Sequence, residues 1–168
     1  MMQTAILAIL PLCLAIAAIS DLMTMTIPNR VSLLLAVSFL AAAPLAGMPL
    51  AEMGIHLAAG LAVFAACFGL FAANVMGGGD AKLLTAAAFW FGLNQSLILF
   101  LVYVGLLGGA ITLLVLFIRT RADHALALGI RLPASLSSAK KIPYGLAIGL
   151  AGFLAWPESP LFALLTAR

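Results

Sequence analysis

Charged residues are scarce in this chain: 8% of its 168 residues are charged, whereas 65% are apolar. Because ordinary soluble domains carry about 25% charged residues, this composition excludes that class and indicates a protein embedded in a bilayer. A helix needs roughly 20 apolar residues to cross the hydrocarbon core, so the length allows at most about six or seven spans with short loops. We therefore expect one membrane-embedded domain over residues 1–168.

Cysteine is almost absent as well. Cys13 and Cys67 stand alone in apolar runs, without a C-x-x-C pair or a nearby histidine, as small apolar side chains do. His56 and His124 lack the spacing of metal ligands, so we expect neither a metal site nor a disulfide. The net charge of +3 comes from a few basic residues between long apolar runs. Membrane topology explains these residues better than binding to nucleic acid does.

Six apolar stretches are predicted to be membrane helices, which gives an all-α polytopic fold. They cover residues 4–20, 31–50, 54–74, 83–93, 97–118 and 142–156. The fourth and the sixth are short: a helix over residues 80–93 covers only about 21 Å, less than the hydrocarbon core. Irregular backbone at membrane depth is tolerated only where it is buried in protein or lines a wet cavity. The glycines at 77–79 and the start of the sixth helix are therefore expected to line such a cavity.

The basic residues predict how the chain is oriented in the membrane. If six spans alternate, seven of the eight Lys and Arg residues fall on one side, and only Arg168 falls on the other. The positive-inside rule makes that side cytoplasmic and places both termini outside. The N-terminal stretch has no basic residue before its apolar run, so we expect a first membrane helix and not a cleaved signal peptide. The seven residues are Arg30, Lys82, Arg119, Arg121, Arg131, Lys140 and Lys141.

Of the five acidic residues, Asp21 and Asp80 directly adjoin predicted apolar helices. Ionisable groups at membrane depth are unfavourable and are functional candidates by default. The plainer interpretation makes Asp80 a helix N-cap and Asp21 a solvated loop carboxylate. Two carboxylates on one membrane face instead suggest an acid–base pair that activates water. Lys82 and the positive end of the fourth helix would favour the charged form of Asp80.

Three short segments carry a resemblance to a known family. Residues 77–80 read G-G-G-D, residues 21–29 begin with Asp and end in I-P-N, and residues 141–145 read K-I-P-Y-G. In this order and spacing they resemble the motifs of the type IV prepilin peptidases, membrane aspartic proteases with a G-x-G-D signature. The resemblance covers nearly the whole chain. It implies that Asp21 and Asp80 are the catalytic pair, with no metal and no organic cofactor.

The resemblance also implies a substrate and a location. The substrate would be a prepilin whose leader peptide is cut after a glycine, at the cytoplasmic face of the bacterial inner membrane. Larger members carry a cytoplasmic loop with paired C-x-x-C motifs that is associated with N-methylation. This chain lacks those motifs and resembles the short, peptidase-only form of tight-adherence (Flp-type) pilus systems. The residues expected to bind substrate or shape the site are Gly77, Gly78, Gly79, Lys82, Pro143 and Gly145.

Two other functions remain open from the residues alone. A proton- or cation-coupled transporter also uses buried aspartates and broken helices, although such sites lie near the midplane and not toward one face. A non-catalytic subunit of a membrane assembly could pack through small residues such as those at 105–109.

Overall fold

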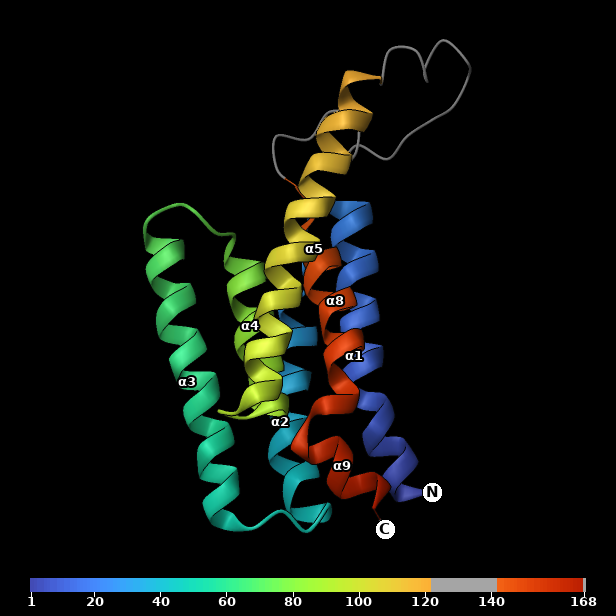
Figure 1. Ribbon diagram of the computed structural model, residues 1–168, viewed down its shortest axis with the longest axis vertical. Helices are drawn as coiled ribbons and strands as arrows, with labels where there is room; N and C mark the ends of the chain where they lie inside the picture. Colours follow the sequence, from blue (N-terminus) through green and yellow to red (C-terminus); the bar gives the residue numbers. More distant parts are fainter. Residues whose placement is uncertain (122–141, 168) are drawn as a thin grey trace.

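The computed structural model describes residues 1–121 and 142–167, and every regular element in them is a helix (Figure 1). The helices are α1 (Met2–Thr24), α2 (Asn29–Leu45), α3 (Leu50–Ala72), α4 (Gly78–Phe91), α5 (Gln95–Thr120), α8 (Tyr144–Ala155), the 3-10 helix η1 (Trp156–Glu158) and α9 (Pro160–Thr166). Each predicted apolar stretch corresponds to one of these helices. The prediction of an all-α polytopic membrane protein is confirmed.

Three helices, α1, α3 and α5, are long and apolar enough to cross a membrane. The segment from Tyr144 to Thr166 adds a fourth candidate span, which is bent by 53° at the break before α9. The apolar helix α2, with 17 residues, is shorter, and so is α4, with 14. The predicted shortness of the fourth and sixth helices is thus present in the structure, and both lie inside the bundle.

Successive helices run in opposite directions, so the bundle has two distinct ends (Figure 1). The upper end holds the last turn of α1 and the first turns of α2, α4 and α8, and the lower end holds both chain termini. The basic residues Arg30, Lys82, Arg119 and Arg121 belong to the upper end. Glu52 and Glu158 belong to the lower end. His124, Arg131, Lys140, Lys141 and Arg168 lie outside the described residues.

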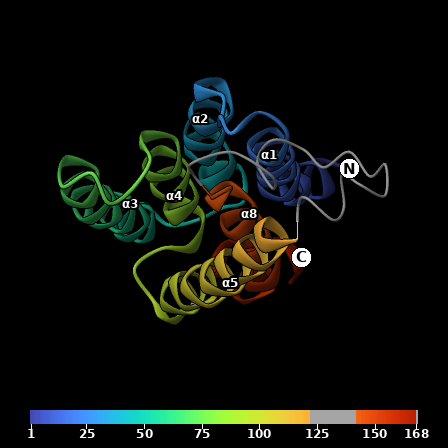
Figure 2. The same ribbon diagram turned by 90° about the horizontal axis from the view of Figure 1, so that it is seen from above.

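The two short helices are enclosed by longer neighbours (Figure 2). Helix α4 packs between α2 and α3, and α8 packs between α1 and α5. Because α4 and α8 also contact each other, the two outer groups form one bundle. A short inner helix leaves room above its first turn, which is where a cavity at membrane depth can form.

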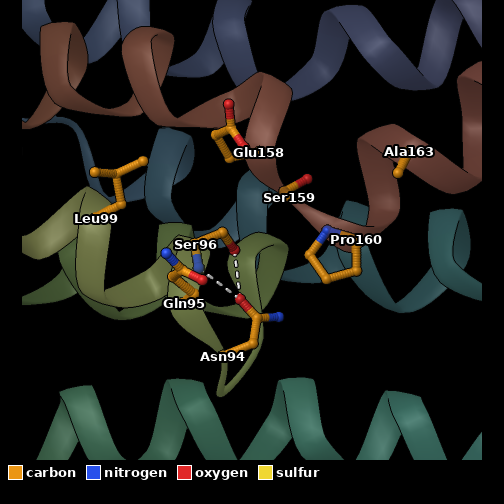
Figure 3. A pocket seen from close by; sticks show the side chains of 8 residues that line it. All are labelled: Asn94, Gln95, Ser96, Leu99, Glu158, Ser159, Pro160 and Ala163. Atoms are coloured by element: carbon orange, nitrogen blue, oxygen red, sulfur yellow. Dashed lines mark hydrogen bonds between the residues drawn. The ribbon is translucent and has the colours of Figure 1, made fainter.

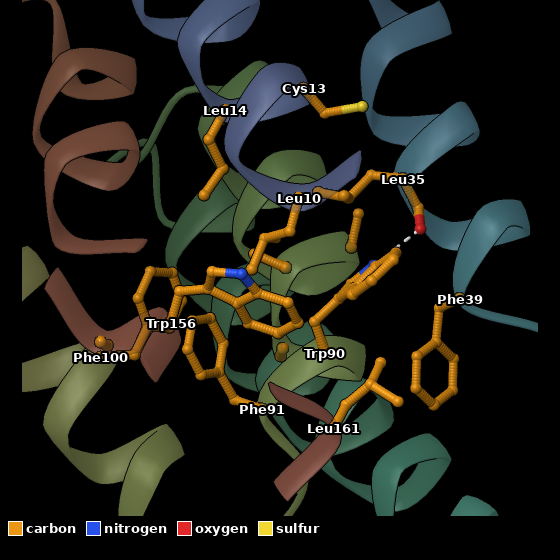
Figure 4. Packing of buried hydrophobic residues seen from close by; sticks show 14 of the residues in the cluster. Leu10, Cys13, Leu14, Leu35, Phe39, Trp90, Phe91, Phe100, Trp156 and Leu161 are labelled. Atoms are coloured by element: carbon orange, nitrogen blue, oxygen red, sulfur yellow. Dashed lines mark hydrogen bonds between the residues drawn. The ribbon is translucent and has the colours of Figure 1, made fainter. Parts of the chain in front are cut away.

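The core of the bundle is packed around two tryptophans (Figure 4). Trp90 of α4 is fully buried and meets Trp156 edge-on, with the ring centroids 5.7 Å apart. A buried indole N–H needs an acceptor; that of Trp90 donates to the backbone oxygen of Leu35 at 2.9 Å. The indole N–H of Trp156 donates to the backbone oxygen of Leu7 at 3.3 Å. These contacts fix the lower, C-terminal ends of α4 and α8. They thereby also position the upper ends of both helices.

Glycine lets α8 approach α1 closely. A Cβ atom at Gly149 would lie 2.9 Å from the Cβ of Ala18 and 3.1 Å from the backbone oxygen of Leu14. Small residues at such crossings allow two membrane helices to pack backbone to backbone. The approach brings the first turn of α8 to the last turn of α1.

We expect Gly149→Ala to destabilise the protein because one of the two packed backbones must move. Overpacking of this kind costs about 1–3 kcal/mol, which corresponds to a Tm lower by roughly 3–10 °C. The measurement is thermal unfolding in detergent, followed by fluorescence.

Gly109→Ala is the matched control, since nothing lies within 4 Å of a Cβ atom built at that helical position. Its Tm should be unchanged or slightly higher, because Ala favours the helix over Gly. Equal Tm values for the two variants would contradict the close α1–α8 contact.

Candidate functional site

Asp21 lies in the last turn of α1, and only 6% of its surface is exposed. Helix α1 ends at Thr24, and Met25 follows in the left-handed conformation with φ 56°. The N–H of Met25 donates to the backbone oxygen of Asp21 at 2.9 Å, which closes the helix. The interpretation of Asp21 as a solvated loop carboxylate is therefore wrong, because its side chain is turned into the bundle.

The side chain of Asp21 is held by the start of α8. The N–H of Gly145 donates to Oδ2 of Asp21 at 2.7 Å. The first N–H groups of a helix have no partner inside the helix, so a carboxylate at that position satisfies one and meets the positive end of the dipole. A Cβ atom at Gly145 would lie 2.9 Å from both Cβ and Oδ2 of Asp21, so only glycine allows this approach.

Pro143 and Gly145 have separate roles at this helix start. Pro143 is the N-cap of α8, with φ −73°, and α8 begins at the next residue. Proline has no N–H to leave unsatisfied at such a position. The segment around Pro143 and Gly145 thus places a backbone donor against the first aspartate.

Asp80 lies in the first turn of α4, and its surface is partly buried. The N-cap of this helix is Gly77, and the helix begins at Gly78. Both the prediction that α4 begins at Asp80 and the alternative that Asp80 is the N-cap are therefore wrong. The carboxylate remains at the positive end of the helix dipole, which favours its charged form.

Each of the three glycines before Asp80 makes room for a different neighbour. A Cβ atom at Gly77 would lie 2.7 Å from Oδ2 of Asp80, and one at Gly79 would lie 3.3 Å from Cβ of Ile27. One at Gly78 would lie 3.2 Å from Cε2 of Phe71 on α3. The glycines therefore let the start of α4 fit against the segment after α1 and against α3. They also line the cavity described next.

The two aspartates line one cavity of about 220 Å³ at the upper end of the bundle. It is lined by Asp21, Met25, Thr26, Ile27, Asn29, Gly77, Gly78, Gly79, Asp80 and Ile142. A water molecule takes about 30 Å³ of liquid volume, so the cavity has room for several waters or for a water and a peptide group. Two carboxylates at such a space can act as general acid and general base on a bound water.

Lys82 is hydrogen-bonded to the start of α2. Its ammonium group donates to Oδ1 of Asn29 at 3.0 Å, which ties α4 to the first residue of α2. Lys82 is thus brought to the I-P-N segment, and its support for the charge of Asp80 stays a prediction. Its role in the structure is to hold the two helix starts together.

Several residues that were not predicted as site residues also line the cavity, among them Met25, Thr26, Asn29 and Ile142. The hydroxyl of Ser20 donates to the backbone oxygen of Thr26 at 2.9 Å and fixes the turn after α1. In the sequence, this turn is marked by three closely spaced residues with hydroxyl groups, Ser20, Thr24 and Thr26. Ile142 was not named singly, but it begins the sixth apolar stretch, whose start was expected to line a cavity.

A second hollow, of about 340 Å³, lies at the lower end (Figure 3). Several of its polar groups serve as helix caps. Oδ1 of Asn94 accepts from the N–H of Ser96 at 2.8 Å and from the Ser96 hydroxyl at 2.6 Å. The hydroxyl of Ser159 accepts from the N–H of Phe162 at 3.1 Å. Glu158 is the one carboxylate among its lining residues, so it offers no acid–base pair.

Within residues 1–121 and 142–167, no group of three or more His, Cys, Asp or Glu side chains is placed to hold a metal ion. The cavity presents the two carboxylates, the amide of Asn29 and the hydroxyl of Thr26. These groups suit the binding of water and of a peptide bond.

A comparison with family models matches residues 8–119 to the type IV leader peptidase family. The matched segment contains both aspartates and the glycine triplet. No curated protein and no solved structure matches the chain.

We expect a cysteine in the cavity wall to react with a membrane-impermeant maleimide from one side of a sealed vesicle. The variant is Met25→Cys in a Cys13→Ala, Cys67→Ala background, and labelling is read as a mass shift. Because Met25 lines the upper cavity, it should be labelled from the same side as Arg121→Cys and from the side opposite to Glu158→Cys.

Val63→Cys is the matched control, since Val63 is buried inside α3 and should be labelled from neither side. Labelling of Met25→Cys from the Glu158 side, or no labelling at all, would contradict a water-filled cavity open to the upper end.

Proposed function

The chain belongs to the type IV leader peptidase family, and we propose that it cuts its substrate with Asp21 and Asp80. The family consists of aspartic-type peptidases that remove the leader peptides of prepilins, and this is the function of the chain. The single observation that supports the two residues is their shared cavity. Each comes from a different motif and a different helix, and each is held at the start or end of that helix.

The reaction requires one proton shared by two carboxylates. The ionised aspartate takes a proton from water, which attacks the carbonyl carbon of the scissile peptide bond. The protonated aspartate gives its proton to the developing oxyanion, which yields a gem-diol. The aspartate that took the proton from water then gives it to the amide nitrogen, the C–N bond breaks to release the amine of the new N-terminus, and one diol hydroxyl returns its proton to the other aspartate. Because Oδ2 of Asp21 accepts the Gly145 N–H, we assign the proton exchange to Oδ1 of Asp21.

We extend the proposal to the substrate path. A cavity of about 220 Å³ holds the scissile peptide group but not a whole leader. The leader would therefore pass the glycines at 77–79, where a cut after a small residue such as glycine places little side chain in the cavity. We propose that this passage is shaped on one side by Gly77, Gly78 and Gly79. Its opposite wall is proposed to be formed by Pro143 and Gly145.

We also propose the cytoplasmic orientation, with both termini outside. It is supported by the basic residues Arg30, Lys82, Arg119 and Arg121 at the end of the bundle that carries the cavity. The two cysteines are buried in α1 and α3 and form no C-x-x-C pair. This supports a single peptidase domain without the methylation loop, as in the Flp-type form.

We expect Asp21→Asn and Asp80→Asn each to abolish leader removal from a co-expressed prepilin. Loss of general acid–base catalysis lowers the rate by about 10²- to 10⁴-fold, which leaves the precursor uncut on a gel. Asn has nearly the same shape as Asp, so the protein should accumulate at normal levels.

Glu158→Gln is the matched control, because it removes a carboxylate at the lower end, away from the cavity. It should process the prepilin fully. Full processing by either aspartate variant would exclude the pair, while loss of processing in the control as well would indicate a general folding defect.

Gly145→Ala tests the contact that positions Asp21. The added Cβ would overlap the carboxylate and Cδ1 of Ile27, each 2.9 Å away, so the carboxylate or the start of α8 must shift. Misplacement of a reacting group by about 1 Å lowers the rate by roughly 100-fold, so we expect kcat to fall by about 10- to 100-fold with little change in KM.

The measurement is cleavage of a purified prepilin by the purified enzyme, with Gly109→Ala as the control that should match the unmodified chain. An unchanged kcat in Gly145→Ala would show that the contact does not position Asp21. A fall in Tm equal to that of Gly149→Ala would assign the effect to folding instead.

A further inference from the structure

A third hollow, of about 540 Å³, runs along the outside of α4 between α2 and α3. Its lining residues, called here the groove residues, are Asn29, Arg30, Ser32, Leu33, Ala36, Phe64, Lys82, Thr85, Ala86 and Phe89. Helix α2 contributes residues 29, 32, 33 and 36 together with Arg30 beside the first of them, and α4 contributes 82, 85, 86 and 89. Apart from Arg30, the spacing is regular. Both sets follow the i, i+3, i+4, i+7 spacing of one helix face, so the groove extends for about two helical turns.

The groove has one cationic end and an apolar interior. Arg30 and Lys82 lie at the upper end, one at the start of α2 and the other in the first turns of α4. Deeper along the groove the walls are apolar, and they include Leu33, Phe64 and Phe89. The matching ligand has an anionic head and a hydrocarbon chain.

Ser32 supplies a second and independent indication of a ligand. Its side chain is 7% exposed, lines the groove, and has no hydrogen-bond partner for Oγ among the described residues. The facing hydroxyl of Thr85 is satisfied, because it donates to the backbone oxygen of Ala81 at 2.8 Å. A buried hydroxyl without a partner is unfavourable by an amount comparable to a lost hydrogen bond. Ser32 follows Arg30 by two residues and lies about one turn after Asn29, near the level at which a head group would meet the chain.

We propose that the groove binds an anionic phospholipid, with the phosphate at Arg30 and Lys82 and one acyl chain along Leu33, Phe64 and Phe89. Basic residues between membrane helices at the cytoplasmic side attract anionic head groups. The Ser32 hydroxyl donates to an oxygen of the head group or its ester. A leader peptide with a basic N-terminal region fits the same groove less well, because it would place like charges against Arg30 and Lys82.

The bound lipid would touch the wall of the aspartate cavity. Asn29 lines both spaces, and it accepts the hydrogen bond from Lys82 at 3.0 Å. A phosphate beside Lys82 therefore lies next to the residue that joins the groove to the cavity. The inference itself concerns binding, and its test reads lipid binding without any peptidase assay.

The test is native mass spectrometry of the full chain released from detergent, titrated with phosphatidylglycerol or phosphatidylcholine of the same chain length. We expect one phosphatidylglycerol molecule to be retained, with a Kd at least about fivefold lower than that of phosphatidylcholine. A fivefold difference in Kd corresponds to the contribution of one basic residue to the binding of an anionic lipid. Arg30→Gln should remove most of this preference. Ser32→Ala should raise the Kd for both lipids.

Arg121→Gln is the matched control, because it removes the same charge at the same end of the bundle outside the groove. It should keep the preference. Ala36→Phe fills the groove without changing charge and should abolish retention of either lipid.

Two results would overturn the proposal. Equal loss of preference in Arg30→Gln and Arg121→Gln would show a diffuse charge effect with no site. Displacement of the retained lipid by a synthetic leader peptide, together with loss of peptide binding in Ala36→Phe, would assign the groove to the substrate instead.

Discussion

The hydrogen bond from the Gly145 N–H to the carboxylate of Asp21 joins two segments that are 124 residues apart in the chain. It depends on three other features of the structure. Glycine must occupy position 145, α8 must begin beside the last turn of α1, and the tryptophan contacts must fix the far end of α8. An unpaired helix N–H at membrane depth is unfavourable, so the pairing stabilises the fold while it fixes the direction of the carboxylate.

The shortness of α4 and α8 is what gives the site its electrostatics. At about 1.5 Å per residue, α4 spans roughly 21 Å and the neighbouring α5 roughly 39 Å. The first turns of α4 and α8 therefore point two positive dipole ends at the space that holds the two carboxylates. A pair that shares one proton keeps a net negative charge, and these helix starts compensate part of it.

Much of the fold could be predicted from the sequence, since apolar runs and their breaks give the helices directly. The start of α4 was misplaced because two glycines in a row argue against a helix, yet Gly78 and Gly79 lie in its first turn, where contacts with Phe71 and Ile27 decide the conformation. The proximity of Asp21 and Asp80 was expected from their place on one membrane face and from the family motifs. The burial of Asp21, the Gly145 donor and the Asn29 partner of Lys82 could not be predicted, because each depends on a contact between distant segments.

The I-P-N segment shows why three adjacent residues belong to one motif. Ile27 packs against both Gly79 and Gly145 and so separates the starts of α4 and α8. Pro28 caps α2 in an extended conformation, with φ −63° and ψ 128°. Asn29 then accepts the bond from Lys82. Each residue fixes a different helix start around the same cavity, and a one-residue shift of the segment would move all three contacts at once.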